Sequence, residues 1–175
     1  MRSIVLMLLM VLVGVCDCIA QAQQRDVCVS AVPANIHAGL LTQEIVGLIQ
    51  VSPTFRAQCE RIAAAHHLSI DVELVHTIGV AQADTVIRRY EAGALRAKVR
   101  IAFGRDYREL IAHEFEHVIE QLDGVDLQAE TLRDGAWLVD AQVFETRRAS
   151  EIGRRVRREC ELSNGHAAVV VHDLR

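Results

Sequence analysis

Hydrophobic positions near the start of the chain recur every three or four residues, which predicts two consecutive helices. Apolar side chains follow this spacing across residues 42–50 and again across residues 53–65, as expected when one face of a helix is buried. Pro53 suits the first turn of the second helix, where no backbone N–H is needed. We therefore expect two helices with a short break before Pro53.

Hydrophobic and polar residues then alternate, which is the period of a half-buried strand. The alternation is clear across residues 68–78, and shorter runs at 85–90 and 95–103 flank residues 91–94. Gly93 favours a turn between these two runs, because glycine adopts backbone angles that other residues avoid. The sequence therefore predicts a short antiparallel sheet that contains a hairpin.

Helical spacing returns in the second half of the chain and predicts two longer helices. Asp106 can cap the first of them and Gly124 can end it. The second is expected over roughly residues 135–161, followed by a tail in which residues 167–171 are a candidate late strand that we cannot place. Helices and strands thus fall into separate runs, which predicts an α+β fold.

Length and composition are those of one small domain. The chain has 175 residues and shows no repeats and no low-complexity linker, while its aromatic content of 4% predicts a core made mostly of Ala, Val, Ile and Leu. The formal net charge is -4, whereas proteins that bind the phosphates of nucleic acids need a basic surface. We therefore expect no nucleic-acid partner.

The first residues have the pattern of an export signal. The apolar run at 4–15 is short for a membrane span but long enough for the hydrophobic region of a signal peptide, and Ala20 and Ala22 supply the small residues that a signal peptidase requires. We predict a signal peptide at 1–22 and a single mature domain at 23–175. The mature protein would be periplasmic or secreted, without stable membrane insertion.

Two other interpretations of the N-terminus remain. The apolar run could be retained as a transmembrane anchor. A lipoprotein is less favoured, because the residues before Cys16 and Cys18 are Val15 and Asp17, neither of which is small.

Signal cleavage would leave three cysteines in an oxidising compartment. Cys28, Cys59 and Cys160 predict one disulfide and one remaining thiol, but sequence alone does not choose the pair. The alternative is that all three are unpaired small apolar residues. The chain has no C-x-x-C pattern, so a cysteine-based metal site is not expected.

The strongest chemical signal is His113-Glu114-Phe115-Glu116-His117 within the helix that follows Asp106. Two histidines four residues apart leave the same helix face and can bind one metal ion through nitrogen. Glu114 lies beside them, where a carboxylate can accept the proton of a water molecule activated by zinc. Metal-free alternatives would leave His113 and His117 solvated on a polar helix face.

This motif resembles that of the zincin metallopeptidases, which share H-E-x-x-H on a helix. The resemblance implies a zincin-like domain over roughly residues 68–160, with zinc as cofactor and a peptide or protein as substrate. In zincins an edge strand beside the active helix holds an extended substrate by backbone pairing. That role would fall on residues 95–103, including Val99 and Ile101.

The third metal ligand decides the branch of the zincins. The metzincin extension H-x-x-G-x-x-H is absent after His117. Gluzincins use a Glu from a later helix, and Glu145 matches because it interrupts the apolar stripe of the last predicted helix, where an unpaired carboxylate is costly. Glu120 and Glu130 are the alternatives, although we favour an indirect role for Glu120 behind His117.

The chain departs from the thermolysin-like pattern, in which an Asp four residues after the Glu ligand orients the first His. That position is Ala149 here, so Asp140 or a backbone carbonyl would have to serve. Candidates for stabilising a developing oxyanion are, by residue type alone, Tyr107, Tyr90 and His76.

The leading functional hypothesis is a zinc metallopeptidase with His113, His117 and Glu145 as metal ligands and Glu114 as the base. A domain of this size leaves little room for a deep cleft, so a protein partner could complete the site. Two alternatives are a non-catalytic zinc-binding envelope protein and a metal-free helical interaction module.

Overall fold

The computed structural model describes most of the chain after its first thirty residues. The ranges are 31–79, 81–104, 106–131, 133, 135–140 and 143–172. The predicted signal peptide and Cys28 lie outside these ranges. Within them the fold is of the mixed α+β class, as predicted.

Three of the predicted helices are confirmed. They are α2 (Thr42–Val51), α3 (Pro53–Ala64) and α4 (Tyr107–Leu122). Asp106 caps α4 by accepting a hydrogen bond from the backbone N–H of Arg108 at 3.1 Å, and Gly124 follows the helix with a positive φ of 70°. The side chains of Phe55 and Phe115 stack in the core with ring centroids 5.5 Å apart, which joins α3 to α4.

The sheet has four strands in the order β1-β2-β4-β3. Their bounds are β1 (Ile36–His37), β2 (Leu68–Val75), β3 (Ala83–Arg89) and β4 (Leu95–Ala102). The predicted hairpin between β3 and β4 is present, but β2 pairs in parallel with both β1 and β4. The prediction of an antiparallel sheet is therefore wrong. The chain crosses over between β1 and β2, and β4 returns from β3 into the position next to β2, where it runs parallel to β2.

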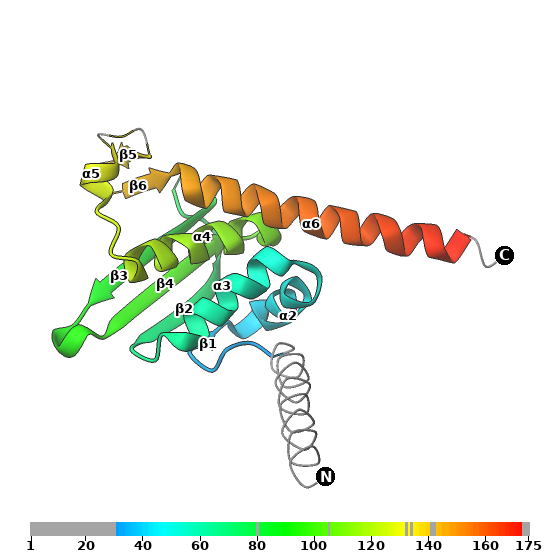
Figure 1. The fold of residues 1–175 in the computed structure, drawn as a ribbon, viewed down its shortest axis with the longest axis horizontal. Coiled ribbons are helices and arrows are strands. Elements are labelled where there is room, and N and C mark those ends of the chain that lie inside the picture. The colour runs from blue at the N-terminus through cyan, green and yellow to red at the C-terminus, as the bar shows by residue number, and fades with distance from the viewer. Residues whose placement is uncertain are drawn as a thin grey trace, which may run out of the picture. The chain divides into compact units, whose positions relative to one another are not determined.

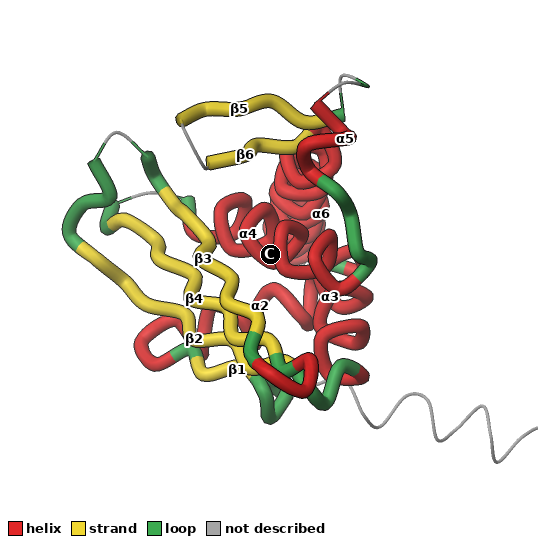
Figure 2. The backbone as a smooth tube through the Cα atoms, turned by 90° about the vertical axis from the view of Figure 1, so that its left-hand side faces the viewer, coloured by secondary structure: helices red, strands yellow, loops and turns green. Residues whose placement is uncertain are grey.

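A second correction concerns the strand at the edge of the sheet. β4 lies between β2 and β3 and pairs with both along its length, so its backbone is already used. Val99 and Ile101, which were expected to bind substrate, are fully buried core residues. The edge strand on this side is β3 (Figure 2).

Alternation along β4 separates a buried face from an exposed one. Leu95, Ala97 and Val99 are buried under the helices, whereas Arg96 and Lys98 point to the opposite, solvent-exposed face. Figure 1 shows α4 along the sheet with the last helix beside it. The helix that carries the His-Glu-Phe-Glu-His motif is therefore packed on both sides.

The region expected to be one long helix from residue 135 instead begins as a hairpin. Strands β5 (Ala136–Asp140) and β6 (Val143–Thr146) pair with each other before α6 (Arg147–His172) starts. A run of aromatic and β-branched residues explains the strand, because such side chains favour extended backbone. Glu145 consequently lies on β6 and not on the last helix.

Further along, α6 extends past its predicted end. Its helical backbone includes residues 167–171, so the candidate late strand there is also wrong. A short helix, α5 (Leu127–Thr131), lies between α4 and the hairpin. Among all the residues that the structure describes, none of the helices is both long and apolar enough to cross a membrane.

Two of the three cysteines of the predicted mature chain are buried free thiols in the structure. Cys59 lies on α3 and Cys160 on α6, and they do not form a disulfide with each other. Burial raises the pKa of the Cys59 thiol to about 12, and the nearby Glu60 carboxylate adds to the effect. A disulfide between these two residues, one of the pairings that the sequence allowed, is absent.

Gly153 allows α6 to approach α4 closely beside the motif. A Cβ atom at this position would lie 3.0 Å from the carbonyl oxygen of Glu109 and 3.1 Å from Cβ of His113. Gly47, in α2, offers a contrast, because a Cβ atom there would contact nothing within 4 Å. A methyl group can therefore be added at Gly47 without a clash, whereas at Gly153 it would clash with α4.

This contrast gives a matched prediction for stability. Gly47→Ala should raise the free energy of unfolding by about 0.5–1 kcal/mol, because alanine is the better helix former. Gly153→Ala should lower it by about 1–3 kcal/mol, because the added methyl group forces α6 away from α4. Urea unfolding of both variants tests this, and equal gains in stability would contradict the close helix contact.

Candidate metal centre

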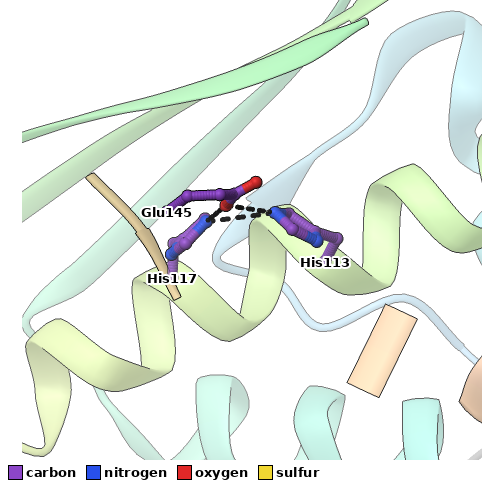
Figure 3. Close-up of side chains that lie close together, drawn as sticks. All are labelled: His113, His117 and Glu145. Carbon is purple, nitrogen blue, oxygen red and sulfur yellow. Dashed lines mark hydrogen bonds and ion pairs between the residues drawn. The ribbon is translucent and has the colours of Figure 1, made fainter. Parts of the chain in front are cut away.

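Three side chains from two separate elements converge on one point. Nε2 of His113 and Nε2 of His117 lie 3.2 Å apart on α4, and Oε1 of Glu145 on β6 lies 2.8 Å from the first and 2.9 Å from the second. Figure 3 shows the carboxylate facing both imidazole rings. These three residues form the one group among the described residues whose donor atoms are arranged to hold a metal ion.

The helix explains how the two histidines meet. They are one turn apart on α4, so their rings leave the same face and their centroids lie 4.9 Å apart. Glu145 reaches them because β6 ends directly at the start of α6, which packs along α4. The ligand thus comes from the end of a strand, two residues before the helix begins.

Glu120 holds His117 from its other side. Its Oε2 lies 3.0 Å from Nδ1 of His117, and its Oε1 accepts a hydrogen bond from the Thr146 hydroxyl at 2.7 Å. A carboxylate at Nδ1 favours the tautomer in which that nitrogen carries the proton and Nε2 is free to bind a metal ion. Glu120 is therefore placed to orient His117 without joining the cluster.

Thr146 connects this network to the start of α6. Its hydroxyl oxygen accepts a hydrogen bond from the backbone N–H of Ala149 at 3.0 Å, which is the bond of a helix N-cap. The same hydroxyl donates to Glu120, so the cap, the orienting carboxylate and the neighbouring Glu145 are linked. Thr146 and Glu120 are both almost completely buried, which keeps this arrangement rigid.

Interactions within the cluster stabilise the charged forms of His117 and Glu145. Burial opposes the charge on His117, but hydrogen bonds to Glu120 and Glu145 outweigh burial and raise the pKa of His117 to about 10. Burial likewise opposes the charge on Glu145, yet bonds to His113 and His117 lower the pKa of Glu145 to about 2. Glu145 is therefore ionised at neutral pH, as a metal ligand must be, whereas a metal ion that binds His117 has to displace the proton that the two carboxylates stabilise on its ring.

Glu114 lies beside the cluster in a different environment. Its side chain is buried, and its Oε2 accepts a hydrogen bond from the hydroxyl of Thr85 on β3 at 2.7 Å. Burial raises the pKa of Glu114, although the nearby His117, the bond from Thr85 and the nearby His113 partly offset the increase. The result is a carboxylate whose affinity for a proton is above that of an exposed Glu.

The donor set matches the chemistry of a zinc site. Comparisons with family models, curated proteins and solved structures gave no match. Two imidazole nitrogens and one carboxylate oxygen are a common set of ligands in catalytic zinc sites. Bonds of 2.0–2.2 Å to a tetrahedral ion place donor atoms roughly 3.4 Å apart, close to the separations of 2.8–3.2 Å here.

The other predicted site residues lie elsewhere. Glu130, a rival third ligand, is on α5 and accepts a hydrogen bond from Arg133 at 3.2 Å. Tyr90 stacks under Arg96 at the far end of β3, five residues from Thr85 and thus roughly 17 Å along the strand. This position excludes Tyr90 as an oxyanion group at the cluster.

Three predicted roles are not decided by the geometry. Tyr107 begins α4 six residues before His113, and His76 follows β2 with its ring 5.3 Å from that of Phe103. Asp140 lies in β5, and its side chain is outside the described part of the structure. Roles of Tyr107 and His76 in oxyanion stabilisation, and of Asp140 in orienting His113, stay predictions.

Sequence reasoning missed Thr85 and the network around Glu116. Glu116 is buried, and its carboxylate accepts hydrogen bonds from Arg148 at 2.6 Å and from Gln58 at 2.7 Å. Arg148 also donates to Asp123 at 2.9 Å. Through these hydrogen bonds, Glu116 connects α4 to both α3 and α6. Thr146 had a readable signal in its residue type, because threonine is among the preferred N-cap residues.

The geometry around His117 gives a prediction for metal affinity. If the cluster binds a metal ion, Glu120→Gln or Thr146→Val should weaken binding by about 10–100-fold, because the first replaces the carboxylate that fixes the tautomer of His117 and the second removes the hydroxyl that holds this carboxylate. Competition with a chromophoric chelator measures the affinity. Thr131→Val is the control, since the Thr131 hydroxyl only bonds the carbonyl of Gln128. Unchanged affinity in both test variants would contradict an orienting role.

Proposed function

We propose that the protein is a zinc-dependent peptidase of the zincin type, similar to the gluzincin branch. His113, His117 and Glu145 would hold the metal ion, and Glu114 would act as general base. The observation that carries this proposal is the convergence of two Nε2 atoms and one carboxylate oxygen, separated by 2.8–3.2 Å, from two elements distant in sequence. Glu145 is not part of the motif, so its arrival at the histidines supports the assignment independently.

The chemistry follows from the positions of the chain's own groups. Bound zinc would supply a Lewis acid that polarises the peptide carbonyl. Glu114 would take the proton of the attacking water and pass it to the leaving amine, a role that suits a carboxylate whose pKa is raised by burial. Thr85 would hold Glu114 in place through its hydrogen bond of 2.7 Å.

The substrate would be an extended polypeptide that binds beside β3. The resemblance to zincins implies backbone pairing with an edge strand near the active helix, and in this sheet the edge strand is β3. Thr85 lies on β3 and contacts Glu114, so a peptide paired with this edge would pass close to the base. The N-terminal pattern supports export to the periplasm or beyond, where a protein partner could complete the cleft.

The proposal is tested by removing and restoring the metal. The purified mature protein should cleave fluorescently labelled unfolded casein. A zinc chelator should stop this cleavage, and one equivalent of added zinc should restore it. Zinc content is measured in parallel. A protein that binds zinc tightly at the triad but cleaves no polypeptide would instead be a non-catalytic zinc-binding protein.

A further inference from the structure

The hairpin that carries Glu145 also exposes large apolar side chains. Trp137, Leu138 and Val139 on β5 are 46%, 54% and 61% exposed. Successive residues on a strand leave opposite faces, so Trp137 and Leu138 expose apolar groups on different faces of the hairpin. The partner strand of β5 in this hairpin is β6, which supplies Glu145 to the candidate metal centre.

The strand register places Trp137 on the same face as Glu145. The two residues are direct cross-strand partners in the antiparallel hairpin, and such partners point to the same face with Cβ atoms about 5 Å apart. The carboxylate of Glu145 points at His113 and His117 (Figure 3). The register therefore places Trp137 on the face of the hairpin from which Glu145 reaches the cluster.

The base of the hairpin is fixed while Trp137 is open to solvent. Ala136 and Thr146 pair across the hairpin and are both buried, and the backbone N–H of Arg147 donates to the carbonyl of Gly135 at 2.9 Å. An exposed tryptophan on an anchored strand presents a large apolar surface at little entropic cost. Such a residue suits recognition better than core packing.

We propose that Trp137 determines substrate specificity by forming an apolar wall beside the metal centre. This inference rests on the proposed peptidase function and names its substrate class: polypeptides with a bulky apolar or aromatic side chain next to the scissile bond. The indole contacts that side chain, while Glu145 on the paired strand holds the metal. One hairpin thus supplies both a ligand and a specificity surface.

The face of the hairpin provides a matched control. Leu138 neighbours Trp137 in sequence but pairs with Phe144, so its side chain leaves the opposite face. Leu138→Ala removes a similarly exposed apolar group from the same strand. A general loosening of the hairpin would affect both variants, whereas a specificity role affects Trp137 alone.

The test uses two zinc-binding probes, phenylalanine hydroxamate and glycine hydroxamate, which differ only in the side chain. Zinc content is measured first, and affinities are then obtained by calorimetry. The wild type should bind the phenylalanine probe at least about tenfold more tightly. Trp137→Ala should abolish this preference at unchanged zinc content, while Trp137→Phe and Leu138→Ala retain it. Trp137 is the single tryptophan of the chain, so its fluorescence should change when the phenylalanine probe binds.

Two outcomes overturn the inference and are distinguishable. If the wild type binds zinc but shows no preference, or if Trp137→Ala keeps the preference, the role of Trp137 is wrong and the metal centre stands. If the wild type carries no zinc after supplementation and binds neither probe, the proposed function fails and this inference fails with it.

Discussion

Replacing Glu114 with Gln is expected to reduce polypeptide hydrolysis by about 10³-fold while the protein still binds one zinc ion. The amide keeps the size of the side chain and can still bond the Thr85 hydroxyl, but it cannot accept a proton. Glu114 does not belong to the group of donor atoms formed by His113, His117 and Glu145, so metal binding should persist. Initial rates and zinc content, measured on the same preparation, separate the two effects.

Glu109→Gln is the matched control for this experiment. Glu109 is also on α4, but its carboxylate accepts a hydrogen bond from Arg157 and does not belong to the group of donor atoms. The control should keep full activity. Normal turnover by Glu114→Gln would show that another group is the base, and loss of zinc would show that Glu114 acts through the metal site's structure.

The second large effect is expected for stability. Arg148→Met should lower the free energy of unfolding by about 3 kcal/mol, because it leaves the buried carboxylate of Glu116 without its cationic partner. Only 4% of the Glu116 side chain is exposed, so water cannot replace the guanidinium. Arg148→Met also removes the bond to Asp123. Guanidinium chloride unfolding measures the loss.

Two further variants isolate the cause. Arg157→Met removes an arginine from the same helix whose partners, Glu109 and Glu161, are more exposed, and it should cost less than about 1 kcal/mol. Glu116→Gln combined with Arg148→Met removes the buried charge and should recover part of the stability. Equal losses in Arg148→Met and Arg157→Met would contradict the conclusion that the buried carboxylate of Glu116 depends on Arg148.

Local patterns sufficed to predict the helix that carries the motif. Asp106 and Gly124 mark its two ends, and the four-residue spacing of His113 and His117 places both rings on one face. These features depend only on neighbouring residues, so no knowledge of the remaining fold was needed. The approach of Thr85 to Glu114 depends instead on how β3 packs against α4, which no local pattern encodes.

Glu145 was predicted as the third ligand on the assumption that it lies on a helix, which is wrong. Its position was inferred from an apolar stripe on a helix that would start near residue 135, but the stripe included Leu138, which is on a strand and 54% exposed. The helix begins only at Arg147, after the Thr146 cap. The structure nevertheless brings Glu145 to the two histidines, from the end of β6.

Strand order was likewise beyond local reasoning. The runs at 68–75 and 95–102 have the same alternation whether they pair in parallel or antiparallel. They are parallel because β4 lies between β2 and β3 in the sheet. The edge strand is therefore β3, and not β4 as the sequence had suggested. The expected substrate-binding strand changed for this reason.

The most direct test of the whole account is elemental analysis of metal bound to the purified mature chain. The comparison covers the wild type, three ligand variants and Glu130→Ala as the control, because Glu130 lies outside the cluster. We expect about one zinc per chain in the wild type and the control, and loss of zinc in His113→Ala, His117→Ala and Glu145→Ala. A wild type that stays metal-free after zinc supplementation, or a Glu145→Ala variant that keeps its zinc, would contradict it.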